Sequence, residues 1–405
     1  MGWEVFLSEK CSERAEAKVH EIAEALVGME VQNGGLMSGA AGLACFYAYY
    51  ADWTGDLLFD RLVAEVLDQA LNPPAGLFPG PKFSDGLAGI AWIIDHLKSK
   101  GLLTYDISGI FDQLDPVLYD FMMKEIADGR YDYLHGALGI ALYFLRDTEN
   151  RKYSSYLEEL VKELHAHAQA DADGSIRWHS VLDADSGLKG TNLSLSHGMA
   201  SIIIVLSRIR DAGIAQERCE SLIEGGLKFM QKQRLAKDKH ISIFPSWALE
   251  NEKEPHYSRL AWCYGDLGIG MAYLRAGQLQ SNSGHAMEGM DILIKSSGRK
   301  DLQENKVHDA GICHGAAGLA LIYNFLYQRS ERKVFMEAGL HWLDVLLNMA
   351  VHEDGIAGYK AWYHPEYGGW TATGGLLEGA SGIGLVLLSF LSDTEPSWGR
   401  SLLLE

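Results

Sequence analysis

The sequence is poor in cysteine and contains no long apolar run. Its 405 residues include 5 cysteines, an odd number that is too small for a disulfide framework, and no basic segment followed by an apolar one opens the chain. A reducing cytoplasm is therefore the expected location. No apolar run approaches the roughly 20 residues that a membrane-spanning helix needs. We expect no direct membrane insertion, and any membrane association would have to come through a partner.

Basic residues are also scarce relative to acidic ones. The chain has 35 Lys and Arg against 54 Asp and Glu, which gives a formal net charge of -19. Such a charge repels polyanions, so we do not expect nucleic acid as a partner, whereas a cationic or neutral peptide is compatible with it.

A Gly-x-x-Gly pair followed by an apolar segment recurs seven times, with Ser201 in place of the second glycine in the fourth copy. The first glycines of the pairs are Gly39, Gly86, Gly136, Gly198, Gly265, Gly315 and Gly379. The segments that follow are apolar almost all round, as helices buried on every side are. Between them lie segments with one polar face, at about 11–27, 54–71, 114–128, 152–170, 215–234, 283–297 and 332–350.

This alternation predicts an all-α fold, an α/α toroid of seven inner and seven outer helices, as a single domain over residues 1–405. An open helical solenoid is the alternative, but its terminal repeats should be polar on one side. The last apolar segment, 382–388, is as apolar as the middle ones, which favours closure of the ring.

Three connections are longer than twenty residues: 171–196, 235–262 and 351–378. Loops of this length are usually functional, and these three emerge at the end of the ring where the glycine pairs lie, so we expect the functional site there. A few short strands are expected in the loops, at 175–179 and 240–244.

A polar residue precedes the first glycine in every copy. These residues are Ser38, Asp85, His135, His197, Tyr264, His314 and Glu378. Ser38 and Asp85 are expected to be helix N-caps, but histidine and tyrosine are poor caps and need another explanation. We expect the glycines themselves to allow close approach between helices.

Two cysteines and a histidine stand at the starts of neighbouring apolar segments, namely Cys263 and the adjacent pair Cys313 and His314. Two thiolates and one imidazole with an open fourth position are typical of catalytic zinc. The spacing alone leaves both a zinc site and ordinary buried cysteines open. The other cysteines fall in helical segments without such neighbours and are expected to be small core residues: Cys11, Cys45 and Cys219.

The segments Trp262-Cys263-Tyr264-Gly265 and Cys313-His314-Gly315, together with the seven repeats, resemble the lanthionine synthetase C family. This family comprises the lanthipeptide cyclases and their eukaryotic LanC-like relatives, and the resemblance covers nearly the whole chain. It implies the toroid fold and a Zn²⁺ ion bound by Cys263, Cys313 and His314. It also implies active-site roles for His197, Asp132, Arg259 and Tyr264.

The family reaction adds a peptide cysteine thiol to dehydroalanine or dehydrobutyrine and forms a (methyl)lanthionine thioether ring. We interpret His197 as the proton donor, Asp132 as the residue that orients it, Arg259 as a stabiliser of negative charge and Tyr264 as a secondary donor. A purely structural hydrogen bond of Asp132, and an ion pair of Arg259 with Asp266 or a loop carboxylate, are the alternatives.

The chain resembles the freestanding bacterial cyclases of this family. That resemblance implies a dehydrated precursor peptide as substrate, a separate dehydratase as partner and an export transporter as a second partner. Two other functions remain open. One is a LanC-like enzyme that adds glutathione to dehydroamino acids in proteins, and the other is a non-catalytic, zinc-stabilised scaffold that binds a peptide.

Overall fold

The computed structural model describes residues 2–31, 33–72, 79–103, 108–183, 186–236, 239–250, 255–279 and 283–404. The chain divides into two compact units. Unit 1 comprises Met1–Ser108 and Val307–Glu405, and unit 2 comprises Gly109–Lys306. A single domain over 1–405 stays a prediction. None of the described helices combines the length and the apolar character that crossing a bilayer requires.

Half-buried and fully buried helices alternate along the described residues, as the sequence predicts. The half-buried helices are α1 (Glu9–Leu26), α3 (Leu57–Leu71), α5 (Ser108–Ala127), α7 (Arg151–His167), α9 (Gln216–Lys232), α11 (Ser283–Ser297) and α13 (Lys333–Asn348). The buried helices are α2 (Ala40–Thr54), α4 (Leu87–Ser99), α6 (Ala137–Phe144), α8 (Met199–Asp211), α10 (Asp266–Leu279), α12 (Ala316–Ser330) and α14 (Ala380–Leu391). Every side chain of α6 is buried, whereas α7 buries one stripe, from Tyr153 to Leu164.

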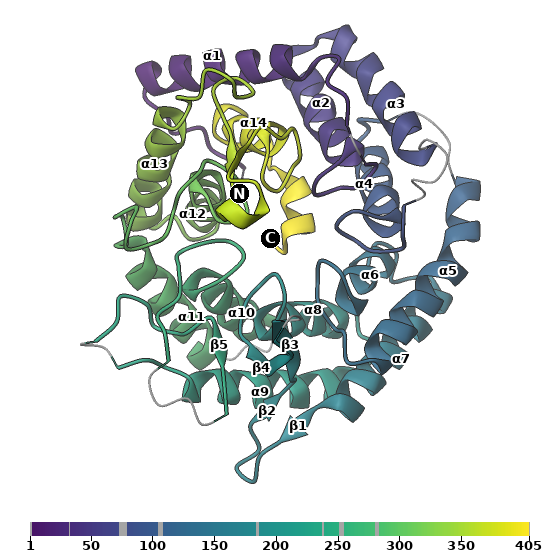
Figure 1. The fold of residues 1–405 in the computed structure, drawn as a ribbon. Helices are drawn as coiled ribbons and strands as arrows, with labels where there is room; N and C mark the ends of the chain where they lie inside the picture. Colours follow the sequence, from purple (N-terminus) through teal and green to yellow (C-terminus); the bar gives the residue numbers. More distant parts are fainter. Residues whose placement is uncertain are drawn as a thin grey trace. The chain divides into compact units, whose positions relative to one another are not determined.

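In unit 1 the two ends of the chain pack together. The buried helices α12, α14, α2 and α4 are successive neighbours, and α1 lies against both α14 and α13 (Figure 1). The Trp3 indole N–H donates to the Ser389 carbonyl of α14 at 2.8 Å. Contact between the first and last helices is what a closed arrangement requires and what an open solenoid lacks. In unit 2 the neighbours α6, α8 and α10 are each covered by the helix that follows: α7, α9 and α11.

The buried helices begin with backbone capping rather than side-chain capping. The first amides of α12, those of Ala316 and Ala317, donate to the carbonyls of Asp309 and Ala310 at 3.1 and 3.2 Å. A Cβ on Gly318 would lie 2.0 Å from the Ile312 carbonyl oxygen, so a side chain cannot be accommodated there. Helices α2 and α14 are capped in the same way by residues 33–35 and 373–375.

Two sequence-based predictions about these helix starts are therefore wrong. A Cβ on Gly42, Gly89 or Gly382 would meet the preceding turn of backbone rather than a neighbouring helix, whereas on Gly268 it would lie 2.7 Å from Leu195 of the neighbouring turn. Ser38 and Asp85 are not N-caps, because the N-cap residues are Gly39 and Gly86, and the Ser38 hydroxyl contacts Asn33 instead.

The turns that precede the buried helices are hydrogen-bonded to one another. In unit 1 the Ile312 N–H donates to Leu377 O at 2.9 Å, the Leu377 N–H to Met37 O at 2.8 Å, and the Met37 N–H to Ser84 O at 2.7 Å. In unit 2 the Leu195 N–H donates to Cys263 O at 3.1 Å. These backbone contacts position the turns that carry His314, Glu378 and Ser38 in unit 1 and His197 in unit 2.

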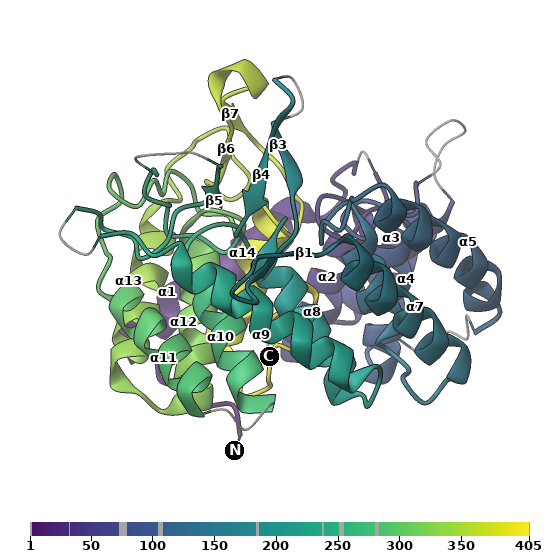
Figure 2. The same cartoon turned by 90° about the horizontal axis from the view of Figure 1, so that it is seen from below.

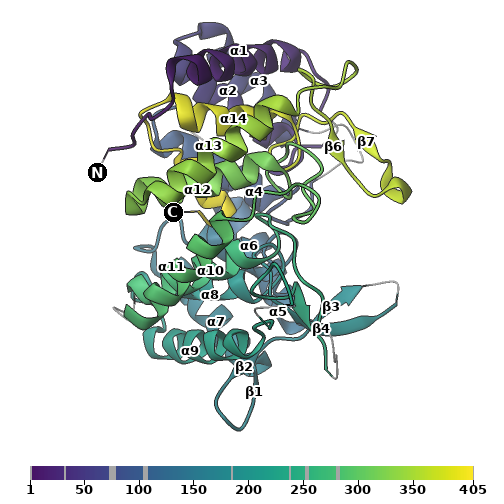
Figure 3. The same cartoon turned by 90° about the vertical axis from the view of Figure 1, so that its left-hand side faces the viewer.

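The long connections carry short antiparallel strands. They are β1 (Gln169–Ala170) with β2 (Ile176–Arg177), then β3 (Ser180–Asp183), β4 (Leu188–Asn192) and β5 (Trp247–Ala248) in one sheet, and β6 (Ala361–Trp362) with β7 (Trp370–Thr371). Strands β6 and β7 extend beyond the ends of α12 and α13 (Figure 2), and β3 and β4 extend beyond α8 and α9 (Figure 3).

The two strand predictions have different outcomes. The strand expected at 175–179 is present as β2, in shorter form. The strand expected at 240–244 is wrong. The Ile243 and Phe244 amides do not enter a ladder because they donate to the Asp266 carboxylate at 2.9 to 3.1 Å.

Candidate metal centre and catalytic residues

Cys313 and His314 lie in unit 1, on the turn that precedes α12. The Cys313 N–H donates to the Leu377 carbonyl at 2.9 Å, which fixes the backbone of the turn. His314 Nε2 lies 3.5 Å from the Asp309 carboxylate and 3.4 Å from the Trp362 carbonyl oxygen in β6. Both Cys313 and His314 are partly exposed. The turn therefore presents a thiol and an imidazole side by side.

Asp309 is buried beneath this turn, with its side chain 1% exposed. Burial alone would raise the pKa of its carboxyl, but hydrogen bonds from His314, Trp362 and Gly311 hold the pKa below its ordinary value. The carboxylate is therefore ionised at neutral pH.

Cys263 lies in unit 2, on the turn that precedes α10. It is 5% exposed, and its carbonyl accepts hydrogen bonds from the Leu195 and Ser196 amides and from the Ser196 hydroxyl at 3.1 to 3.3 Å. These three bonds tie Cys263 to the turn that carries His197.

The Sγ atoms of Cys263 and Cys313 and one ring nitrogen of His314 lie within 4.8 Å of one another. Among the residues that the structure describes, this is the one group of three or more His, Cys, Asp or Glu side chains that could hold a metal ion. Three ligands with two sulfurs and one nitrogen fit zinc and leave one tetrahedral position for a further ligand. The three predicted metal ligands are thus brought together.

The remaining cysteines lie elsewhere. Cys45 and Cys219 are completely buried in α2 and α9, and Cys11 is partly exposed on α1. Burial raises the pKa of the Cys219 thiol to about 12 and raises the pKa of the Cys45 thiol as well, so both are protonated core residues.

His197 and Asp132 form a hydrogen-bonded pair in unit 2 between His197 Nδ1 and Asp132 Oδ2. The other Asp132 oxygen accepts the His135 N–H at 2.7 Å, and the His197 N–H donates to Ser194 Oγ at 3.1 Å. Both partners of the pair are therefore fixed by backbone contacts as well as by each other.

The pair shifts the acidity of both groups. Burial opposes the charge of each, but the hydrogen bond and the attraction between them raise the pKa of His197 and lower the pKa of Asp132. An imidazolium held beside a carboxylate can deliver a proton and then be reprotonated, which is the behaviour expected of a general acid.

Tyr264 and Arg259 flank Cys263 on the same turn. The Asn192 side-chain amide donates to Tyr264 Oη at 3.2 Å, and the Tyr264 and His197 ring centroids are 6.1 Å apart. Burial raises the pKa of Tyr264, so its phenol is a neutral donor at physiological pH. Arg259 is partly exposed four residues before Cys263.

The alternative of an Arg259–Asp266 ion pair is wrong. The guanidinium that pairs with Asp266 is that of Arg299, with Nη1 2.9 Å from Oδ2.

Sequence reasoning missed functional candidates at two positions. The His135 ring stacks on the His197 ring with centroids 5.8 Å apart. Its position directly before the first glycine of a pair, which it shares with His197, could have identified it from the sequence. Asp309 lies six residues before Gly315, the position that Asn33 and Asn192 occupy before their own glycines, and this alignment was the signal for it.

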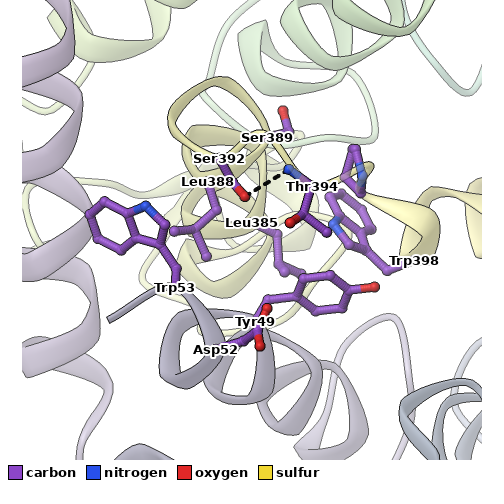
Figure 4. Close-up of a pocket in the computed structure, with 10 residues that line it drawn as sticks. Tyr49, Asp52, Trp53, Leu385, Leu388, Ser389, Ser392, Thr394 and Trp398 are labelled. Atoms are coloured by element: carbon purple, nitrogen blue, oxygen red, sulfur yellow. Dashed lines mark hydrogen bonds between the residues drawn. The ribbon is translucent and has the colours of Figure 1, made fainter. Parts of the chain in front are cut away.

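Unit 1 also contains a separate pocket, lined by residues that lie toward the C-terminal ends of α2 and α14 rather than on the turns before these helices (Figure 4). Tyr49, Asp52 and Trp53, near the C-terminal end of α2, line it together with residues of α14 and of the segment that follows α14. None of the predicted site residues lines this pocket.

The chain is similar to known lanthionine-forming proteins over nearly its whole length. The family model "Lanthionine synthetase C-like protein" matches residues 30–403. The nisin biosynthesis protein NisC of Lactococcus lactis subsp. lactis is 24% identical over an alignment of 389 residues, which covers 91% of this chain and 88% of NisC. The solved structure of nisin cyclase superimposes with a TM-score of 0.74 at 20% identity and covers 98% of each chain. This structural match confirms the predicted α/α toroid fold.

Proposed function

Because the chain is a member of the lanthionine synthetase C-like family, we propose that it is a zinc-dependent lanthipeptide cyclase. Its substrate would be a dehydrated precursor peptide. The reaction would join a peptide cysteine thiol to a dehydroalanine or dehydrobutyrine of the same peptide and form a (methyl)lanthionine thioether. The dehydrated residues would come from a separate dehydratase, and an export transporter would be a further partner.

The observation that carries this proposal is the convergence of Cys263, Cys313 and His314, with ligand atoms within 4.8 Å of one another. The proposed cofactor fits this donor set, because thiolates and imidazole are the ligands that zinc prefers. When bound, zinc would supply a Lewis-acidic position that favours the deprotonated form of a thiol at neutral pH. The two protein thiolates would offset the charge of the ion and keep that sulfur electron-rich.

The residues around Cys263 would complete the addition. When the thiolate sulfur bonds to the β-carbon of the dehydroamino acid, the π electrons move toward the carbonyl and leave an enolate, which needs one proton at the α-carbon. His197 would deliver this proton, since its imidazolium form is stabilised by Asp132. The thiol loses one proton and the α-carbon gains one, so the reaction is balanced overall.

Arg259 and Tyr264 would stabilise the negative charge that develops on the enolate oxygen. Tyr264 supports this assignment through its position beside His197 and its neutral phenol. The assignment of Arg259 is supported by its partly exposed position on the turn that carries Cys263.

Metal analysis and a thiol count would test the proposal. We expect one zinc per purified chain and none in the Cys263→Ala variant. Ring formation does not change peptide mass, so cyclisation would be followed by alkylating the remaining free thiols. His197→Asn should retain zinc and slow cyclisation by about 10²–10⁴-fold, the usual effect of removing a general acid. Undiminished cyclisation by His197→Asn would remove its assigned role.

The same assay separates the cyclase from the two other functions. A dehydrated peptide with and without its own cysteine would be supplied together with glutathione. Glutathione adducts on both peptides would favour the glutathione-adding enzyme. A scaffold without catalytic activity would give neither rings nor adducts, and His197→Asn would leave its peptide binding unchanged. A wild-type chain that binds no zinc and closes no ring would refute the proposed function.

A further inference from the structure

The turn before α12 carries an aspartate, Asp309, where the turns before α2 and α8 carry an asparagine. Asn33 Oδ1 accepts the Gly35 N–H at 2.9 Å, and Asn192 Oδ1 accepts the Ser194 N–H at 3.0 Å. Asp309 Oδ1 makes the same bond to the Gly311 N–H at 3.1 Å. In these three turns the bond uses one side-chain oxygen, which asparagine supplies in two of them. The second carboxylate oxygen of Asp309 is therefore not required by the turn.

That second oxygen lies between the histidine and the β6 strand. Asp309 Oδ2 accepts the Trp362 N–H at 2.8 Å and lies 3.5 Å from His314 Nε2. The His308 and Trp362 rings pack with centroids 4.6 Å apart, which holds β6 against the turn. The long connection 351–378 thus reaches the metal-binding turn through the backbone of Trp362.

Metal-binding histidines almost always donate their second ring N–H to a carboxylate, a carbonyl or water, and this contact fixes the tautomer and the ring orientation. His314 has two such acceptors beside Nε2, namely Asp309 Oδ2 and, at 3.4 Å, the Trp362 carbonyl oxygen. With its proton on Nε2, the imidazole would present Nδ1 as its ligand atom.

We propose that Asp309 is a positioning residue that accepts the His314 Nε2–H and commits Nδ1 of His314 to the metal, with the Trp362 N–H holding the carboxylate in place. This inference rests on the proposed zinc-binding function. It also gives the segment 351–378 a role as a support for the metal ligand.

An ionised carboxylate suits this role better than an amide. Asp309 accepts hydrogen bonds on both oxygens at once, from Gly311 on one side and from Trp362 on the other. An asparagine has a single acceptor oxygen. In an Asp309→Asn variant the amide can preserve the turn through its oxygen, but its NH₂ group would then face the N–H groups of Trp362 and His314. The substitution therefore removes the contact to His314 and spares the turn.

The test is the zinc affinity of Asp309→Asn, measured by competition with a chromophoric chelator. Loss of such a supporting contact typically weakens metal binding by about 10–100-fold, and we expect this range. Asn33→Ala is the matched control, because it removes the equivalent turn bond in a repeat without a metal ligand. Asn33→Ala should bind zinc as tightly as the wild type.

A second measurement reports on the tautomer directly. In protein labelled with ¹⁵N at histidine, a long-range ¹H–¹⁵N spectrum identifies the protonated ring nitrogen of His314, assigned with the His314→Gln variant. We expect the Nε2–H form in the zinc-free wild type and loss of this preference in Asp309→Asn.

Each outcome decides the inference. Zinc affinity within about twofold of the wild type, or an unchanged His314 tautomer, would overturn it while leaving the proposed function intact. A zinc-free Asp309→Asn chain that fails to fold would assign Asp309 a structural role and would also overturn it. A wild-type chain that binds no zinc would instead refute the proposed function on which the inference rests.

Discussion

Replacement of Arg299 by methionine should be among the most destabilising single changes in unit 2. The Arg299 guanidinium donates to Asp266 Oδ2, to the Ser258 carbonyl and to the Asn305 side chain at 2.8 to 2.9 Å. The Asp266 and Arg299 side chains are 1% and 9% exposed. Arg299→Met would leave a buried carboxylate without its counter-charge, which typically costs about 3–5 kcal/mol of the free energy of unfolding.

The free energy of unfolding would be measured by urea denaturation followed by circular dichroism. Arg329→Met is the matched control, because the Arg329–Glu395 pair is 44% and 40% exposed. Exposed pairs contribute about 0–1 kcal/mol, so this variant should remain close to the wild type.

The loss should also depend on pH. Burial outweighs the attraction of Arg299 and the backbone amides, and it raises the pKa of Asp266 above its ordinary value. For a carboxyl with a raised pKa in the folded state, the stabilising contribution is complete below its ordinary pKa and is lost as the pH rises through the folded value. Arg299→Met raises this pKa further. The stability gap to the wild type should therefore widen as the pH rises above the folded-state pKa of Asp266 in the wild type, where the wild type stops losing stability and the variant does not.

A double variant would expose a fault in this reasoning. Asp266→Asn removes the charge and keeps an oxygen for the Ile243 and Phe244 amides. If the unpaired charge is the cause, Asp266→Asn combined with Arg299→Met should be more stable at neutral pH than Arg299→Met alone. A double variant that is no more stable, or a single variant that loses less than 1 kcal/mol at neutral pH, would contradict the argument.

Three further outcomes are expected. Gly382→Ala should lower the free energy of unfolding by about 1–3 kcal/mol or more, because its Cβ would come 1.7 Å from a backbone oxygen. Gly109→Ala, whose Cβ would have no atom within 4 Å, should raise the free energy of unfolding by about 0.4–1 kcal/mol. Urea denaturation would measure both. Trp3→Phe should cost about 0.5–1.5 kcal/mol, the usual net value of one hydrogen bond, and Trp3→Ala more, again by denaturation. Asp132→Asn should lower the pKa of His197, because it removes the negative charge that stabilises the imidazolium. A pH–rate profile of the variant should therefore show the cyclisation rate falling at a lower pH than in the wild type, as His197 loses its proton.

The sequence was most informative where a repeated pattern has one structural solution. An apolar helix alternating with a half-polar one can only be buried inside and covered outside, and the predicted helices match those observed to within a few residues at most ends. The first helix illustrates this agreement: it was predicted at about 11–27 and is observed as α1, Glu9–Leu26. For Cys263, Cys313 and His314 the spacing alone left both a zinc site and ordinary buried cysteines open, and it was the resemblance to the family that implied them as metal ligands.

Features that depend on contacts between distant backbone segments could not be predicted. A glycine in the sequence indicates that a side chain would not fit, but it does not indicate which group occupies the space. Only the structure shows that at Gly318 this group is the Ile312 carbonyl. The segment 240–244 alternates like a strand, yet its Ile243 and Phe244 amides are taken by the buried Asp266. An acidic side chain that replaces a strand partner leaves no trace in local hydrophobic periodicity.

The backbone contacts of the two cysteine-bearing turns bear on what kind of zinc site this would be. Cys263 is anchored through its carbonyl to the Leu195 and Ser196 amides, and Cys313 through its amide to the Leu377 carbonyl. None of these bonds involves a ligand atom, so none of them depends on a bound ion. Structural zinc behaves differently, because its ligands come together only when the metal supplies the folding energy. The turns are held by the protein itself, which is the arrangement expected where the metal acts on a substrate rather than on the fold.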